Sequence, residues 1–270
     1  MSSTVPQGLL RFVYEQAADE YLRSLPPEHF MEPTVQATQR AITLASLALV
    51  AVFRPEVQVF NELLVQYPRK GRRRPGQVVP DNMAVVWDKP IKADTSYDLP
   101  LQPVGPFWVM EYVSKRSKRK DYETSFGKYE RQLKVPYYLL FYPDNQELTL
   151  YHLTGKKYVS VKPNADERYA IPELELELAL LDGWVRFWFR GELLPLPGEL
   201  QQKLMVANRR ADAETRRADE ATRRAEDEAR RADEEHKARL AAEQEAARLR
   251  AELEQLHKPQ KKGRRNGTNP

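Results

Sequence analysis

Two carboxylates lie within apolar stretches of the sequence, thirty residues apart. Asp81 stands near the start of residues 78–86, and Glu111 lies inside residues 107–114. Both stretches are rich in β-branched and aromatic residues, which is typical of strands buried on at least one face. A carboxylate in such a strand costs free energy unless it is paired or binds a metal. Because carboxylate oxygens suit Mg²⁺ or Mn²⁺, we predict that Asp81 and Glu111 converge on one divalent cation.

Each carboxylate also has a purely structural explanation. Asp81 follows Pro80 and could simply begin a strand. Strand alternation places Glu111 on the same face as Val109 and Val113, with large apolar side chains on the other face. Since both faces are apolar, we expect Glu111 to be half-buried in a cleft.

Basic residues concentrate in three short segments, at residues 69–74, 115–120 and 258–265. The first two lie close in sequence to the carboxylates, and a cationic rim around such a centre suits an anionic polymer such as DNA. The alternative is that these segments are solvated turns. The residues that we predict to bind nucleic acid are Arg72, Arg73, Arg74, Lys115, Arg116 and Lys118.

Composition disfavours several other functions. The 270 residues include no cysteine, which excludes disulfides and thiolate chemistry, and the four histidines lack metal-ligand spacing. No Gly-rich phosphate loop or Gly-x-Ser-x-Gly motif occurs. The longest apolar stretch, residues 41–53, is too short to span a bilayer, and the N-terminus lacks the pattern of a signal peptide. We therefore expect a soluble, cytoplasmic protein with no membrane partner.

Residue periodicity predicts an α/β domain over residues 31–200, preceded by an N-terminal helical segment at residues 1–30. Helices and strands alternate along the chain, so we predict a mixed β-sheet flanked by helices. Residues 87–106, rich in proline and charge, are expected to form a loop. The predicted helices are 7–25, 33–52 and 119–134; the predicted strands are 57–67, 78–86, 107–114, 135–142 and 147–153, with a further candidate at 158–161.

A long α-helix is predicted for residues 201–257. Residues 209–257 contain no proline, glycine or aromatic residue, and Arg-Arg-Ala recurs every seven residues. The heptad seam is mostly alanine and polar residues, with leucines near its end, which indicates a weak coiled coil and a homo-oligomer, most simply a dimer. The alternative is a solvated single helix held by side-chain ion pairs. Residues 258–270 are expected to be a disordered basic tail.

An ordered set of motifs resembles one known family. The set comprises Pro80-Asp81, an apolar strand with Glu111 before Val-Ser, a basic segment leading to Asp121, then Val135-Pro136 and Pro143-Asp144. Over roughly residues 30–165 it is similar to the Uma-two family of restriction endonucleases, members of the PD-(D/E)XK nuclease superfamily that are common in cyanobacteria. A long heptad helix also follows this domain in members of the family.

The resemblance implies a restriction-endonuclease-like fold and a metal-dependent endonuclease that hydrolyses DNA phosphodiester bonds. Asp81 and Glu111 would bind one or two Mg²⁺ (or Mn²⁺) ions, and the backbone carbonyl after Glu111 would supply a further ligand. The metal would polarise the scissile phosphate and lower the pKa of a bound water. Either Gln36 or Gln39 would help to hold the metal or the water.

The sequence departs from the superfamily at the lysine expected two residues after the glutamate, where it has Val113. A lysine from a neighbouring helix would have to replace it, and Lys128 is the first candidate, followed by Lys120 and Lys115. Asp121 is expected to cap the next helix rather than to bind metal.

Two other hypotheses remain open. The domain could be a catalytically degenerate nuclease fold that serves as a nucleic-acid-binding or assembly module, as Val113 would favour. Alternatively, the coiled coil could be the functional element, with the globular domain as its scaffold. Magnesium binding distinguishes the first of these from an enzyme, because a binding module needs no metal.

Overall fold

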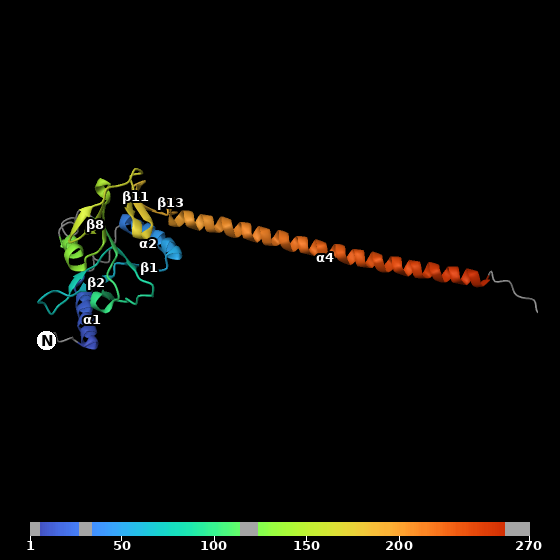
Figure 1. Ribbon diagram of the computed structural model, residues 1–270, viewed down its shortest axis with the longest axis horizontal. Coiled ribbons are helices and arrows are strands. Elements are labelled where there is room, and N and C mark those ends of the chain that lie inside the picture. The colour runs from blue at the N-terminus through green and yellow to red at the C-terminus, as the bar shows by residue number, and fades with distance from the viewer. Residues whose placement is uncertain (1–5, 27–33, 114–123, 257–270) are drawn as a thin grey trace, which may run out of the picture. The chain divides into compact units, whose positions relative to one another are not determined.

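The computed structural model describes residues 6–26, 34–113 and 124–256. The chain divides into two compact units, Met1–Gln201 and Gln202–Pro270. The first is a mixed α/β unit, and the second is the greater part of one long helix (Figure 1). The predicted fold class, a mixed sheet flanked by helices and followed by a long C-terminal helix, is confirmed.

A six-stranded mixed sheet forms the centre of the first unit, in the order β1-β4-β6-β7-β8-β9. Neighbouring strands are antiparallel except β6 and β7, which are parallel. A parallel pair needs a crossover connection, and the helical segment 124–133 lies within it. The strands are β1 (Val57–Asn61), β4 (Asn82–Val86), β6 (Trp108–Tyr112), β7 (Tyr137–Tyr142), β8 (Glu147–Thr154) and β9 (Lys157–Ser160).

One face of this sheet packs against helix α2 (Thr34–Phe53) and a four-stranded antiparallel sheet. Alternate strand residues such as Trp108 and Met110 enter this part of the core, together with Leu47 of α2. The four strands, with the 3-10 turn that joins the first two, are β10 (Tyr169–Ile171), η6 (Pro172–Leu174), β11 (Leu176–Leu181), β12 (Trp184–Phe189) and β13 (Glu192–Leu193). No sequence pattern had singled out this second sheet.

The other face packs against a three-stranded sheet, in the order β3-β2-β5, and against the helical segment 124–133. Val109 and Val113 enter this core from the central sheet. Helix α1 (Gln7–Ser24) is fastened to the small sheet because Gln66 donates a hydrogen bond to the Tyr14 carbonyl at 2.8 Å. The remaining elements are β2 (Leu64–Tyr67), β3 (Gly76–Val78), β5 (Ser96–Asp98), η2 (Leu99–Leu101), α3 (Phe126–Lys128), the π-helical η4 (Tyr129–Leu133) and η5 (Pro143–Asn145).

Three predicted boundaries were wrong. The single strand expected at 57–67 is two strands in different sheets, separated at Glu62, whose φ of 47° breaks the extended backbone. The strand expected at 78–86 is likewise divided between β3 and β4, and Asp81 lies immediately before β4. The loop expected at 87–106 contains β5 and η2. In each case a short polar or proline-rich link moves the chain from one sheet to the next.

Helix α2 is also long and apolar enough to cross a membrane by length and composition alone. Core helices of soluble proteins share these properties. Its buried residues here include Ile42, Leu47 and Val50, and the last two enter the core beside the central sheet. The helix therefore gives no more than weak evidence for a membrane span.

Helix α4 (Pro197–Leu256) is continuous over 60 residues, and all of its side chains that the structure describes are exposed. Ion pairs three or four residues apart run along it, as the single-helix alternative predicts. Leu249 and Leu253 of the heptad seam are 50% and 56% exposed. The pairs are Glu220–Arg224, Asp227–Arg230, Asp233–Lys237, Arg239–Glu243 and Glu252–Arg248.

Candidate functional site

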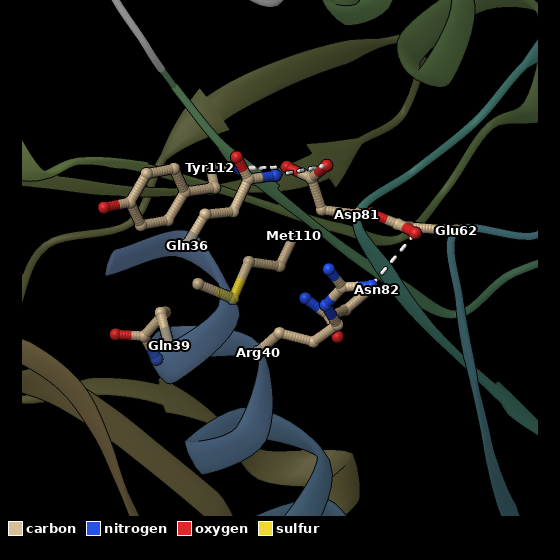
Figure 2. Close-up of a pocket in the computed structure, with 8 residues that line it drawn as sticks. All are labelled: Gln36, Gln39, Arg40, Glu62, Asp81, Asn82, Met110 and Tyr112. Carbon is tan, nitrogen blue, oxygen red and sulfur yellow. Dashed lines mark hydrogen bonds and ion pairs between the residues drawn. The ribbon is translucent and has the colours of Figure 1, made fainter. Parts of the chain in front are cut away.

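Asp81 joins three elements of the fold. One of its carboxylate oxygens, Oδ2, accepts a hydrogen bond from the backbone N–H of Tyr112 at 2.5 Å, at the end of β6. The other, Oδ1, accepts a hydrogen bond from the Gln36 amide of α2 at 3.4 Å (Figure 2). The backbone carbonyl of Asp81 accepts the N–H of Glu62 at 3.2 Å. Asp81 is thus oriented by contacts from both sides of its strand, which is more than a residue that merely begins a strand requires.

A cavity of about 10 Å³ lies beside Asp81, enough for one water molecule. Arg40, one helical turn after Gln36, forms a 2.9 Å ion pair there with Glu62. The amide oxygen of Asn82 is buried and has no hydrogen-bond partner within the described structure. Figure 2 shows the eight lining residues: Gln36, Gln39, Arg40, Glu62, Asp81, Asn82, Met110 and Tyr112.

Glu111 is more deeply buried than expected. Its exposure is 2%, so the prediction of a half-buried side chain was wrong. The reason is that segment 124–133 covers this face of the sheet, and the hydroxyl of Tyr129 donates a 2.6 Å hydrogen bond to Glu111. Glu111 does face the same core as Val109 and Val113, as strand alternation predicted.

Tyr129 is completely buried, and this burial is the largest cause that raises its pKa well above the usual value. The negative charge of Glu111 raises the pKa further, and that of Asp81 acts in the same direction. Tyr129 consequently keeps its proton at neutral pH and remains a hydrogen-bond donor to Glu111. Because the charges of both Asp81 and Glu111 raise the pKa of Tyr129, the three groups interact electrostatically.

The pairing of β4 with β6 brings the backbones of Asp81 and Glu111 near each other. Asn82 pairs with Met110 at the end of this antiparallel ladder, and Asp81 and Glu111 are the next residues beyond that pair. The 29 intervening residues, which include β4 and β5, return the chain to this position.

Asp81 and Asn82 place oxygen donors of the kind that Mg²⁺ prefers beside the cavity, whereas Glu111 is not among its lining residues. Within the described residues no three His, Cys, Asp or Glu side chains gather as a complete cage. Mg²⁺, however, is usually held by one or two carboxylates, with waters and substrate phosphates completing its octahedron. Asp81 and Glu111 would supply the carboxylates, and the unpartnered oxygen of Asn82 is a further hard donor nearby.

Val113 occupies the position of the missing lysine for a structural reason. Its side chain is fully buried in the core that contains Tyr129 and Tyr138, and its N–H donates to the Phe141 carbonyl at 2.7 Å. A lysine at this position would place an ammonium among apolar and aromatic side chains, at a large desolvation cost.

The structure places the other predicted residues in different roles. Lys128 donates a 2.8 Å hydrogen bond to the Gln77 carbonyl and lines a different cavity from that of Asp81. Gln36 contacts Asp81, whereas Gln39 bonds the backbone of Val185 through both ends of its amide. Gln39 therefore fastens α2 to β12.

The predicted DNA-binding residues fall in two groups. Arg72 and Arg73 are exposed in the loop between β2 and β3, and Arg74 pairs with Glu20 at 3.4 Å. Five predicted residues lie outside the described part of the chain: Lys115, Arg116, Lys118, Lys120 and Asp121.

Sequence reasoning missed four residues of the site. Arg40, Glu62 and Asn82 line the cavity beside Asp81, and Tyr129 holds Glu111. Arg40 lies one turn from Gln36 on the same helical face, which was a usable signal. Asn82 directly follows Asp81 in the sequence, whereas only the tertiary structure brings Glu62 and Tyr129 near the carboxylates.

The fold and the site define a mixed α/β domain with one carboxylate inside β6 of its central sheet and another directly before the adjacent strand β4. A family model described as "Putative restriction endonuclease" (Uma2) matches residues 28–182, more than half of the sequence. The chain belongs to the Uma2 family, and the predicted resemblance and restriction-endonuclease-like fold are confirmed.

The chain is similar to a crystal structure from Anabaena variabilis ATCC 29413, described as "a putative nuclease belonging to DUF820". The identity is 15% and the TM-score 0.42, and the match covers 58% of this chain and 89% of that one. A search of curated proteins found no match.

Proposed function

We propose that this protein is a divalent-metal-dependent endonuclease that hydrolyses DNA phosphodiester bonds, with Asp81 and Glu111 as metal ligands. The observation that supports the proposal is the antiparallel pairing of β4 with β6, which runs to Asn82 and Met110, the residues next to Asp81 and Glu111. Membership of the Uma2 family supports the nuclease class.

The surrounding residues would keep both carboxylates oriented. The Tyr112 N–H and the Gln36 amide fix Asp81, and Tyr129 fixes Glu111. When bound, Mg²⁺ or Mn²⁺ would supply Lewis-acid polarisation of the phosphate and a water of lowered pKa. Arg40 stands one helical turn from Gln36 at the same cavity, where its guanidinium would help to balance the charge of a phosphate.

The test combines metal binding with DNA nicking. Calorimetric titration of Mg²⁺ or Mn²⁺ should show binding to the wild type and loss of binding in Asp81→Asn and Glu111→Gln. The wild type should nick supercoiled plasmid, EDTA should stop it, and both variants should lose the activity. Glu192→Gln is a matched control, since Glu192 is exposed on β13. Nicking that persists unchanged in both site variants would refute the proposal.

A second candidate is a nucleic-acid-binding module without catalysis. Two observations favour it: Val113 is sealed in the core, and the Lys128 ammonium bonds the Gln77 carbonyl. This candidate predicts DNA binding that is independent of Mg²⁺, with no metal titration signal in the wild type.

We also propose that α4 associates two copies of the chain, which would supply one active site to each strand of a duplex. The exposed seam residues Leu249 and Leu253 support this proposal. Sedimentation of the full chain should show a dimer that Leu249→Asn with Leu253→Asn weakens, and a monomeric wild type would contradict it. We further propose a cytoplasmic location, which the proposed DNA substrate and the lack of cysteine favour.

A further inference from the structure

A second, larger cavity of about 660 Å³ is lined in part by segment 124–133, whose Tyr129 contacts Glu111. The loop that joins β2 to β3 forms one wall, segment 124–133 forms another, and Tyr21 of α1 contributes from a third element. None of these lining residues belongs to the cavity beside Asp81.

Five cationic side chains line this cavity: Arg69, Lys70, Arg72, Lys128 and Arg131. Its lining within the described residues contains no carboxylate. Like charges that converge on a concave surface repel one another, and a bound polyanion relieves this repulsion. The charge pattern therefore favours an anionic ligand.

Two of the cations are held in place by backbone contacts. Lys128 reaches across the cavity wall to the carbonyl of Gln77 on β3, at 2.8 Å. Arg131 folds back along its own helix, where its Nε donates to the Gly127 carbonyl at 3.4 Å. A Cβ atom at Gly127 would lie 2.4 Å from Arg131 Nη2, so glycine provides the space for this arginine.

The same short segment serves both sites. Lys128 lines the cationic cavity, and the next residue, Tyr129, donates to Glu111. A DNA strand bound at the cationic cavity would therefore be held in a fixed position relative to Asp81 and Glu111. Arg73 extends the cationic surface along the exposed loop beyond the cavity, which suits a polymer better than a single phosphate ion.

We infer that this cavity binds backbone phosphates of the DNA that flanks the cleaved bond, and that Lys128 is a phosphate-binding residue of this cavity. The inference rests on the proposed function, because it takes DNA as the substrate. It assigns Lys128 to substrate binding instead of activation of the attacking water, and it adds Arg69, Lys70 and Arg131 to the predicted DNA contacts.

The test is the salt dependence of duplex DNA binding by the full chain, measured by fluorescence anisotropy in EDTA so that no cleavage occurs. Each lost phosphate contact lowers the slope of log K against log salt by about 0.9. Lys70→Gln with Lys128→Gln should lower the slope by about 1.8. Lys156→Gln with Lys162→Gln, two exposed lysines outside the cavity, should leave the slope at the wild-type value. Equal slopes for the two double variants would overturn the inference.

Kinetics separate the two roles of Lys128. In the nicking assay, Lys128→Gln should lose kcat/KM mainly through a higher KM for DNA, and a loss carried by kcat would overturn the assignment. The proposed function can fail without the cavity assignment. If the double variant at Lys70 and Lys128 lowers the salt dependence of DNA binding but the wild type never nicks DNA, the cavity assignment is supported and the proposed nuclease activity is refuted.

Discussion

The hydrogen bond from Tyr129 to Glu111 offers the sharpest test of the site's construction. Tyr129→Phe removes one hydroxyl and leaves the aromatic ring in the core. Because the acceptor is a buried carboxylate with an O···O distance of 2.6 Å, the loss should cost about 1.5–3 kcal/mol in the free energy of unfolding. A buried charge that loses a donor is expensive because water cannot replace it.

Tyr158→Phe is the matched control. The Tyr158 hydroxyl donates at 2.8 Å to the uncharged Val135 carbonyl, and such a bond contributes only about 0.5–1.5 kcal/mol. Both changes can be measured by urea unfolding monitored by circular dichroism. The comparison requires that the free energy of unfolding depends on urea concentration with the same slope in all variants. Tyr129→Phe should be the more destabilised variant.

A double-mutant cycle isolates the contact itself. Glu111→Gln removes the charge but keeps an acceptor, so Tyr129→Phe should cost less in that background, with a coupling energy of about 0.5–3 kcal/mol. A Tyr129→Phe cost no greater than that of Tyr158→Phe, or a coupling energy of zero, would refute the reasoning that Tyr129 supports a charged Glu111.

Three other predictions follow from the same structure. Burial raises the pKa values of Tyr97 and Tyr112 to about 12. Above pH 10 the folded state therefore binds more protons than the unfolded state, so the free energy of unfolding should fall between about pH 10 and 12. Urea titrations that show a constant free energy of unfolding over this range would contradict the prediction. Gln39→Ala should lower the free energy of unfolding by about 2–4 kcal/mol, because it leaves both the N–H and the carbonyl of Val185 without their hydrogen-bond partner. A melting curve equal to that of the wild type would contradict this prediction. Val113→Lys introduces the lysine that the family resemblance led us to expect at this position. It should unfold the domain or lower its free energy of unfolding by about 3 kcal/mol or more, because the ammonium would enter a buried core. A stable variant that nicks DNA faster would contradict this prediction and show that the side chain reaches the carboxylates.

Under the proposed function, the two cavities have different roles, one in metal binding and the other in DNA binding. Strand pairing sets the separation of the Asp81 and Glu111 backbones, and Gln36 and Tyr129 orient the side chains from opposite faces of the sheet. The cationic cavity lies on an element, segment 124–133, that also contacts Glu111. Under the proposed function, substrate binding and metal binding would be positioned by one short helical segment.

The sequence by itself determined the elements whose signals are local. Apolar composition identified β6, which carries Glu111, and β4, which begins directly after Asp81, because a buried strand must be apolar whatever its neighbours. The heptad repeat likewise identified the long helix, since alanine, arginine and glutamate favour a helix without help from tertiary contacts. Motif order along the chain was sufficient for the family.

Only the tertiary structure decided which distant residues meet. The division of residues 57–67 between two sheets depends on a left-handed backbone at Glu62, which is held by contacts with Asp81 and Arg40. The burial of Glu111 depends on Tyr129, from a segment that crosses over the sheet. Lys128 seemed a suitable replacement for the missing lysine by its helical position, but strand β3 supplies the carbonyl that holds its ammonium. Hydrogen bonds and charges at this range depend on sheet order and crossover path, which no local pattern in the sequence encodes.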